Sequence, residues 1–356
     1  MTTRPVRVGI VGANATRGWA RDAHLAALRA LPEFTIASVS ARTQDIADGA
    51  ATHFGALRAY GDSLEMVRDP AVDVVAVTVK VPEHRAVVLA ALAAGKHVYC
   101  EWPLGRDLAE AREMAAAVPA GIHAMIGLQG LFAPAIVAAA ALLRDGAIGA
   151  PRLLRVFGSA AAWGAETPEF GEYLQDKRTG ATLETIGGGH TLAAAEALVG
   201  RYVEMDARNS TFTRQVRVTG TDRHVTRTCA DHMLVLGRHD SGCVSTFEVV
   251  GGRPEHHTAL FEIEGDKGWL RVKGAVPGTC QIAPLTLAAS MPVTMPEPGV
   301  HGLSGASANV AAAWAHFARD LRGNTFTVPD FATAERLTAL LVAIAAASDT
   351  GQRQAL

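Results

Sequence analysis

The sequence predicts an α/β protein: a doubly wound parallel sheet in the N-terminal part, followed by an α+β domain with a mainly antiparallel sheet. One observation is that the N-terminal part alternates short β-rich runs with helical patterns, which is typical of a parallel sheet with right-handed crossovers. Another is that longer strand-like stretches follow further along the chain, two of them with hairpin turns. A third is the length of 356 residues, which fits two domains of roughly 150 residues or more. We expect domains at 1–125 and 126–356, with the C-terminal helices free to pack back on the first domain.

In the N-terminal part, strands and helices are expected in turn. The run at 72–79 is almost entirely Val and Ala, as in a parallel strand buried on both faces. Gly95 is a good C-terminal stop for the helix before it. The expected strands are 6–11, 34–40, 72–79 and 97–100, and the expected helices are 19–31, 43–54, 83–94 and 108–117.

In the C-terminal part, a helix closing at Asp145-Gly146 precedes a series of strands. The turns at 239–242 and 265–268 indicate hairpins. This pattern predicts an antiparallel sheet with one face toward solvent or a partner. A segment rich in Pro and Gly, 275–303, is expected to be a long loop. The expected strand-like stretches are 153–158, 202–218, 232–250 and 258–272, and the expected helices are 133–143, 306–322 and 332–347.

Composition excludes several classes of protein. Hydrophobic residues make up 49% of the chain and charged residues 19%, which is unlike a disordered chain. The net charge of -2 offers no basic excess for binding nucleic acid. The four cysteines show no close-spaced pairs, so a reducing compartment is expected. We expect no signal peptide, no transmembrane helix and no membrane partner, and hence a cytoplasmic protein.

The first strand leads into a turn that resembles the start of a dinucleotide site. It ends at Gly12, and small residues precede the next helix. Such a turn brings backbone N–H groups close to pyrophosphate at a helix N-terminus. Asn14 stands at the second glycine of the usual G-x-G-x-x-G, and we expect it to tolerate a left-handed backbone there. The alternative is a structural glycine turn without nucleotide. The candidate cofactor-binding residues in this turn are Gly12, Asn14, Ala15, Thr16, Arg17 and Gly18.

The end of the second strand favours NADP over NAD. Sites for NAD place Asp or Glu here to bind ribose hydroxyls, whereas this chain has Ser40 and Arg42. An Arg beside a hydroxyl suits a 2′-phosphate. NAD stays possible, and the alternative is that Arg42 is only a solvated loop residue.

The segment A-G-K-H-V-Y-C-E-W-P-L at 94–104 resembles the A-G-K-H-V-x-x-E-K-P-L motif of the Gfo/Idh/MocA oxidoreductase family. Further resemblances lie at 145–149 (D-G-A-I-G), 265–270 (G-D-K-G-W-L) and 348–351 (S-D-T-G). The resemblance spans nearly the whole chain. It implies an N-terminal Rossmann domain, a C-terminal domain with an open sheet, and an NAD(P)-dependent oxidoreductase.

Three departures from that family matter. Trp102 replaces its catalytic Lys, and in 186–193 both Asp positions of D-x-G-x-H-x-x-D are apolar, Ile186 and Ala193, whereas His190 is kept. The segment after the third expected strand is Val79-Lys80-Val81. These departures resemble the galactose-regulon repressor (Gal80-like) branch of the family. The resemblance implies further cofactor-binding residues: Trp19, Val79, Lys80, His84, Glu101, Trp102 and Gln129.

Because the family's Lys and both Asp residues are replaced, the candidate proton transfer centres on His190, since the usual pKa of histidine is in the range of a general base. Lys80 is the candidate replacement for the missing Lys, and these two are the candidate catalytic residues. The alternatives are a structural His190 and a surface or phosphate-contacting Lys80; for Trp163 the alternative is core packing. No histidine spacing indicates a metal site, His256 and His257 included. The candidate substrate-binding residues are Trp102, Trp163, Asp176, Lys177 and His190.

Three functions stay open on the sequence. The first is an NAD(P)-dependent oxidoreductase acting on a sugar, polyol or related hydroxylated compound. The second is a catalytically inactive dinucleotide-binding sensor or regulator, and the third is a redox-assisted lyase or hydrolase. A small-molecule substrate is the expected partner. We also expect a homodimer or homotetramer formed through an apolar face of the C-terminal sheet.

Overall fold

A computed structural model describes residues 4–252, 258–296, 300 and 302–356. His256, His257 and part of the expected loop at 275–303 therefore lie outside the described residues. Contacts divide the chain into two compact units, one of residues 1–129 and 298–336, the other of 130–297 and 337–356. Each unit is described by itself below.

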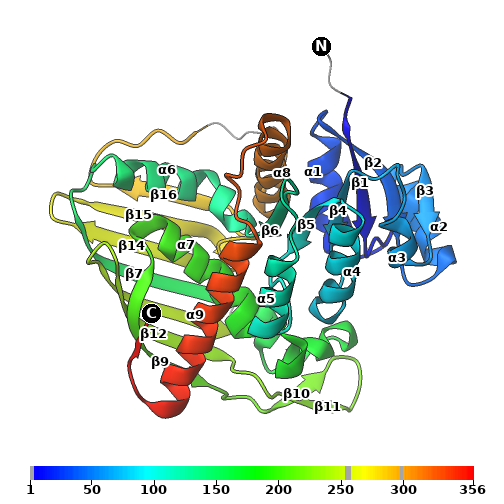
Figure 1. Ribbon diagram of the computed structural model, residues 1–356. Coiled ribbons are helices and arrows are strands. Elements are labelled where there is room, and N and C mark those ends of the chain that lie inside the picture. Colours follow the sequence, from blue (N-terminus) through cyan, green and yellow to red (C-terminus); the bar gives the residue numbers. More distant parts are fainter. Residues whose placement is uncertain (1–3, 253–257, 297–299, 301) are drawn as a thin grey trace. The chain divides into compact units, whose positions relative to one another are not determined.

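The first unit is built on a six-stranded parallel sheet in the order β3-β2-β1-β4-β5-β6 (Figure 1). This is the order of a dinucleotide-binding Rossmann sheet, with its topological switch point between β1 and β4. All four residues of β4 are buried, as the Val/Ala run predicts. The strands are β1 (Val6–Val11), β2 (Phe34–Ser40), β3 (Arg58–Tyr60), β4 (Val74–Val77), β5 (His97–Glu101) and β6 (Ala124–Gly127).

Three helices of the first unit, α2, α3 and α5, begin after a short polar side chain that caps them. Thr43, Asp62 and Asp107 each accept a hydrogen bond from a backbone N–H of the helix that follows. The helix expected at 19–31 is a π-helical turn, η1, continued by α1. The helices are η1 (Ala20–His24), α1 (Leu25–Arg29), α2 (Gln44–Phe54), α3 (Ser63–Met66), α4 (Val81–Ala93), α5 (Leu108–Ala116) and α8 (Gly305–Gly323), with a 3₁₀ turn at Gln129–Phe132. Although α8 comes from the C-terminal part of the sequence, it packs on η1, α1 and β6.

The second unit is built on an eight-stranded sheet in the order β16-β15-β14-β7-β13-β12-β9-β17. Only β7 and β13 pair in parallel, so the expected mainly antiparallel sheet is confirmed. Its strands are β7 (Pro151–Ala160), β9 (Tyr202–Ser210), β12 (His232–His239), β13 (Val244–Gly251), β14 (Thr258–Gly265), β15 (Trp269–Pro277), β16 (Leu285–Ala289) and β17 (Gln354–Ala355). The expectation of one long loop over 275–303 is wrong, because β15 extends into this segment and β16 lies within it.

Both predicted hairpins are present. The N–H of Gly242 donates to the carbonyl of His239, and the N–H of Gly265 donates to that of Gly268. A small sheet of order β11-β10-β8, not expected from the sequence, completes the strands of this unit. Its strands are β8 (Glu166–Thr167), β10 (Gln215–Val218) and β11 (His224–Thr226).

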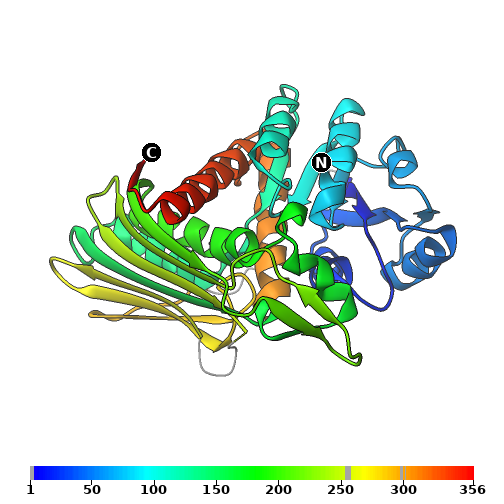
Figure 2. The same ribbon diagram turned by 90° about the horizontal axis from the view of Figure 1, so that it is seen from below.

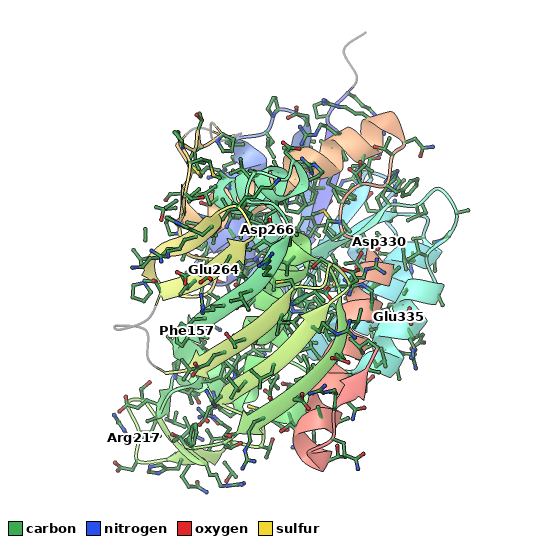
Figure 3. All side chains as sticks on the ribbon, turned by 90° about the vertical axis from the view of Figure 1, so that its left-hand side faces the viewer. Phe157, Arg217, Glu264, Asp266, Asp330 and Glu335 are labelled. Atoms are coloured by element: carbon green, nitrogen blue, oxygen red, sulfur yellow. The ribbon has the colours of Figure 1, made fainter. Side chains whose placement is uncertain are left out.

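Helices cover one face of the large sheet (Figure 2). They are α6 (Pro134–Arg144), α7 (Gly189–Val199) and the π-helical turn η6 (Leu183–Gly188), which pack on its strands. The other face carries apolar residues and ion pairs together, so it is less apolar than expected. The apolar residues on this face include Leu153, Phe157, Leu234, Leu236 and Val244. The ion pairs include Arg155 with Glu262 and Glu264, and Arg271 with Glu262. Figure 3 labels Phe157 and Glu264 on this sheet.

Helix α9 (Phe331–Thr350) is long and apolar enough, by length and composition, to cross a membrane. It is the one such helix in the part of the chain that the structure describes; the sequence predicts a helix here, at 332–347, but no membrane span. One helix of this kind is weak evidence for a membrane span, because core helices pass the same test. Buried positions recur along it every three or four residues, at Phe331, Ala334, Leu337, Leu341 and Ile344, as in a helix that packs on a core.

Candidate functional site

The turn after β1 is tight at Gly12. Gly12 has a φ of +90°, and a Cβ at this position would lie 2.8 Å from Cγ1 of Val79 and 3.1 Å from the Val79 nitrogen. The N–H groups of Gly12 and Ala13 both donate to the carbonyl of Ser40, at 3.0 Å. Only glycine fits here, and the turn is thereby fixed between the carboxyl ends of β1, β2 and β4.

Asn14 shapes the turn through its side chain. Its Oδ1 accepts hydrogen bonds from the backbone N–H of Thr16 at 2.9 Å, from the Thr16 hydroxyl at 2.9 Å and from the N–H of Arg17 at 3.3 Å. Asn14 does not need its tolerance of a left-handed backbone, because Asn324 is the one described non-glycine residue with a positive φ. The carboxamide instead acts as a local acceptor for the two amides.

The turn leads into η1, and the Trp19 indole at this point makes no hydrogen bond with a described residue. Gly18 has a φ of +98°, and its carbonyl accepts from the N–H groups of Arg21 and Asp22. The carbonyl of Ala15 accepts from Nε of Arg21 at 3.1 Å. Nε1 of Trp19 is buried and has no hydrogen-bond partner among the described residues. A buried donor left without a partner is costly, which points to a missing ligand.

At the end of β2, Ser40 and Arg42 differ in how accessible their side chains are to a ligand. The Ser40 hydroxyl is fully buried and lies 3.0 Å from the Ser63 hydroxyl. The hydroxyl is therefore enclosed by the protein, and the expected part of Ser40 in cofactor binding stays a prediction. Arg42 is exposed, and no described residue forms an ion pair with it.

After β4, Lys80 and His84 differ in the solvent exposure of their side chains. Lys80 is exposed and is the N-cap of α4, where its carbonyl accepts from the N–H of Glu83 at 2.8 Å. His84 is buried, and burial lowers its pKa. Its Nε2 lies 3.0 Å from the carbonyl oxygen of Val79, and its Nδ1 lies 3.0 Å from that of Pro103. Both ring nitrogens thus face backbone carbonyls, and the expected part of His84 in cofactor binding stays a prediction.

The motif after β5 places an acid and an indole side by side. Glu101 is the last residue of β5, and its Oε1 lies 2.8 Å from Nε2 of His24. Trp102, which replaces the family's Lys, is buried. The indole of Trp102 can donate a hydrogen bond but cannot shuttle a proton. At the end of β6, the buried Gln129 leaves its Oε1 without a partner among the described residues.

In the second unit, His190 lies in the first turn of α7, directly after η6. A Cβ at Gly188 would lie 2.8 Å from Sδ of Met233 in β12, so a larger residue here would require the Met233 side chain to move. His190 is 5% exposed, and burial lowers its pKa to about 3. Its Nδ1 has no hydrogen-bond partner in the described chain. His190 is therefore a neutral imidazole with a buried nitrogen that the protein itself does not satisfy.

The other expected substrate residues divide by burial. Trp163 is buried, and its Nε1–H donates to the carbonyl of Leu174 at 3.0 Å, which fits the core-packing alternative. Asp176 is bound by Arg178, whose hydrogen bonds lower the pKa of that carboxyl. Lys177 is exposed. Their roles in substrate binding stay predictions.

A buried acid near His190 stands out more clearly than Asp176. Glu184 belongs to η6, and burial raises its pKa. Its Oε1 accepts from the N–H of Ala230 at 3.0 Å, whereas Oε2 has no partner among the described residues. No group of three or more His, Cys, Asp and Glu side chains in the described part of the chain is arranged to hold a metal ion.

The first unit fits a dinucleotide. Gly12 permits close approach of a ligand to the backbone at the switch point of the sheet, where dinucleotides bind. Two buried polar atoms, Nε1 of Trp19 and Oε1 of Gln129, have no partner in the described protein and are free to bind one. Arg42 supplies a positive charge at the end of β2. The residues that would hold the cofactor are those of the turn 12–19, together with Arg42, Glu101 and Gln129.

Comparison with known families agrees with both units. Residues 6–121 match the family described as "Oxidoreductase family, NAD-binding Rossmann fold". Residues 134–274 match the family described as "Gal80p, C-terminal domain".

Individual relatives include both enzymes and regulators. A protein of Aspergillus oryzae named "Dehydrogenase aclE" is 30% identical over 288 residues, which are 76% of this chain and 78% of that protein. The galactose/lactose metabolism regulatory protein GAL80 of Kluyveromyces lactis is 29% identical over 308 residues, 80% of this chain and 67% of that protein. The apo structure of levoglucosan dehydrogenase superposes with a TM-score of 0.87 over 99% of each chain, at 20% identity.

Proposed function

The chain belongs to the Gfo/Idh/MocA oxidoreductase family, with a C-terminal domain of the Gal80p type, and we propose that it is an NAD(P)-dependent oxidoreductase. The proposed substrate is a sugar, a polyol or a related hydroxylated compound. The observation that carries the proposal is His190: a buried, neutral imidazole whose Nδ1 finds no partner in the described protein. Such a nitrogen in a native protein calls for an explanation, and a substrate hydroxyl supplies one.

The cofactor in this proposal is NADP(H) rather than NAD(H). Arg42 is exposed at the end of β2, and no acidic side chain stands there to bind ribose hydroxyls or to repel a phosphate. A bound nicotinamide would accept or donate the hydride. The backbone of the turn at 12–18 would bind the pyrophosphate, with Asn14 keeping that turn in shape.

The proton is assigned to His190, and Lys80 is the second candidate. His190 carries no proton on one ring nitrogen at neutral pH, so it can accept a hydrogen bond and then a proton from a hydroxyl. Lys80 is a donor at the carboxyl end of the sheet of the first unit. Trp102 would contribute an apolar surface and a single N–H.

A second candidate function is a dinucleotide-binding regulator without catalysis. The specific observation in its favour is Trp102 at the position of the family's catalytic Lys, together with the similarity to GAL80 of Kluyveromyces lactis. In this reading His190 and Gln129 would bind a ligand without turning it over.

Self-association through the large sheet of the second unit is part of the proposal. Leu236 and Val244 are each 50% exposed on the face that no helix covers, and exposed apolar side chains gathered on one face favour a partner. We propose a homodimer or homotetramer in which this face meets its copy.

One experiment separates these functions. Titration calorimetry with NADP⁺ and NAD⁺ measures binding, and the absorbance of the reduced nicotinamide is then followed with a panel of sugars, polyols and hydroxylated aromatics. Binding with turnover supports the oxidoreductase. Binding without turnover of any compound supports the regulator, and absence of dinucleotide binding contradicts both.

A further inference from the structure

Three residues form a stripe along the helix start of the second unit, with His190 at its centre. Ile186, in η6, precedes His190 by four residues, and Ala193, in α7, follows it by three. Side chains at these spacings are neighbours on a helix surface. The stripe of Ile186, His190 and Ala193 therefore presents one imidazole between two hydrocarbon side chains.

The other polar side chains of α7 are bonded inside the unit. They are Thr191 and Glu196. The Thr191 hydroxyl donates to the carbonyl of Gly187 at 2.7 Å, and Oε1 of Glu196 accepts from the first backbone N–H of β9 at 3.2 Å. These two side chains thus serve the packing of α7. Along the stripe, Nδ1 of His190 is the polar atom that has no partner among the described residues.

The elements packed around this helix add mostly apolar groups. Helix α7 packs on α6, whose buried residues are Ala135, Ile136 and Ala139. In the segment after β15, the fully buried thiol of Cys280 lies 3.7 Å from the carbonyl oxygen of His190. Burial raises the pKa of this thiol to about 12, so it is not ionised. A hydroxyl that reaches Nδ1 of His190 therefore leaves water for hydrocarbon surroundings with one strong acceptor.

Such surroundings suit an alcohol with few hydroxyls. A hydroxyl that is buried without a partner loses its hydrogen bonds to water, which weakens binding. A sugar or polyol carries a hydroxyl on nearly every carbon, and carboxylates at positions 186 and 193, as in the family's motif, could accept hydrogen bonds from them. Ile186 and Ala193 cannot. They gain instead by covering hydrocarbon.

We propose that the substrate is an apolar alcohol with one or two hydroxyl groups, and that Ile186 and Ala193 are specificity-determining residues that exclude sugars and other polyhydroxylated compounds. The inference rests on the proposed function, whose substrate it narrows. In oxidation, the reacting hydroxyl gives its proton to Nδ1 of His190, and the carbon that bears it gives a hydride to NADP⁺. The alcohol thereby becomes a ketone or an aldehyde, and its hydrocarbon part lies against the stripe.

The test compares rings of one size that differ in their number of hydroxyls: cyclohexanol, trans-1,2-cyclohexanediol and myo-inositol. Titration calorimetry measures the Kd of each for the protein saturated with NADPH, a complex in which the alcohol cannot be oxidised. Cyclohexanol or the diol should bind about 100-fold more tightly than myo-inositol, the discrimination expected of an apolar site against added hydroxyls. The kcat/KM values with NADP⁺ should follow the same order.

Two double variants test the assigned residues. Ile186→Asp with Ala193→Asp restores the family's carboxylates and should lower the ratio of the myo-inositol Kd to the cyclohexanol Kd about tenfold, because it supplies acceptors for the added hydroxyls. Ile186→Thr with Ala193→Ser adds polar atoms at less risk to the fold, which urea unfolding checks, and should lower the ratio in the same direction. Val137→Asp, at a residue of α6 that is 44% exposed, is the matched control and should keep the native ratio.

The outcomes are distinct. A native protein that binds NADPH but binds myo-inositol as tightly as cyclohexanol overturns the inference, as does binding of none of the three compounds or an unchanged ratio in both double variants. A ratio that falls in the double variants and not in Val137→Asp supports it. A native protein that binds no nicotinamide dinucleotide overturns the proposed function, and the inference with it.

Discussion

Val79 leaves no room for a side chain on Gly12: a Cβ there would lie 2.8 Å from its Cγ1 and 3.1 Å from its backbone nitrogen. The two residues follow neighbouring strands, β1 and β4, on either side of the point where the strand order reverses. Their closeness holds the backbone of the turn at this switch point of the sheet, where a pyrophosphate would bind.

Gly12→Ala should therefore weaken both the fold and dinucleotide binding. Overpacking against Val79 costs about 1–3 kcal/mol, and the positive φ adds roughly 1–2 kcal/mol for a residue with a Cβ. Gly18→Ala is the matched control, because Gly18 also has a positive φ but no atom within 4 Å of an added Cβ. Urea unfolding and NADP⁺ calorimetry should show the larger loss at Gly12. Equal losses for the two variants would mean that the contact with Val79 has no effect.

Arg42→Asp should reverse the cofactor preference. The native protein should bind NADP(H) more tightly than NAD(H), since Arg42 is the exposed charge at the end of β2 and the Ser40 hydroxyl is enclosed. An Asp at position 42 would repel a 2′-phosphate and accept hydrogen bonds from ribose hydroxyls. Arg68→Asp makes the same charge change on an exposed residue between α3 and β4, and should leave the ratio of the two Kd values unchanged. A native protein that prefers NAD(H) would refute the assignment.

Much of the fold could be predicted because its strands are long or strongly patterned. The Val and Ala run of β4 is typical of a parallel strand buried on both faces, and the hairpin turns of the second unit are typical of antiparallel strands. Strands β3 and β6 were not predicted, since three and four residues are too few to show a period. Strand β16 was missed because Pro and Gly on both sides of it are typical of a loop. Its pairing with β15 overrides that local preference.

His190 should make stability depend on pH. Burial lowers its pKa in the folded protein from 6.5 to about 3. Below pH 6.5 the unfolded chain binds a proton that the folded chain does not, so the free energy of unfolding falls as the pH falls from 6.5 toward 3. Each pH unit corresponds to about 1.4 kcal/mol for this group. Other buried histidines, His84 and His239 among them, act in the same direction, so the comparison must be with a variant.

In His190→Gln, the loss of stability between pH 7 and pH 5 should be smaller than in the native protein by about 2 kcal/mol. Urea unfolding at the two pH values measures it. His53→Gln, which replaces an exposed histidine, serves as the control and should keep the native dependence. A His190→Gln protein with the native pH dependence would show that His190 titrates normally in the folded state.

Charge introduced on the uncovered face of the large sheet should disrupt self-association. Leu236 and Val244 lie on adjacent paired strands, β12 and β13, and each is 50% exposed. Replacing both with Lys should shift the protein toward the monomer in sedimentation velocity at micromolar concentration, because two charges would face their copies across the interface. Leu57→Lys adds charge at an apolar residue that is 87% exposed in the first unit, and should not change the oligomeric state. A native protein that is monomeric at this concentration would refute the interface.

Less of the site could be predicted than of the fold. Gly12 could be predicted because the sequence around it is typical of a tight turn after a strand. His190 could be predicted because it follows a run of glycines at the start of a helix. The contact between Trp314 and His24 joins positions 290 residues apart, and no local pattern indicates it. The enclosed hydroxyl of Ser40 could not be predicted either, because a polar residue at the end of a strand can point into the core as well as toward a ligand.

His190→Ala should reduce turnover about 100-fold or more in a substrate screen that shows activity, which is the usual contribution of a general acid–base group. His224→Ala, at an exposed histidine of β11, should retain native rates.

Lys80→Ala should reduce turnover as much as His190→Ala does if Lys80 replaces the family's Lys, and less if it only binds the cofactor. Trp102→Lys should not restore ordinary sugar dehydrogenation, because Ile186 and Ala193 stand where the family has carboxylates. The pH profile adds a sharper condition. With a pKa near 3, His190 is neutral in the free protein throughout the physiological range. If kcat/KM of the native protein falls near pH 6.5, the same fall should therefore persist in His190→Gln. Unchanged turnover in His190→Ala would remove this residue from the mechanism and leave the unpartnered Nδ1 without a catalytic explanation.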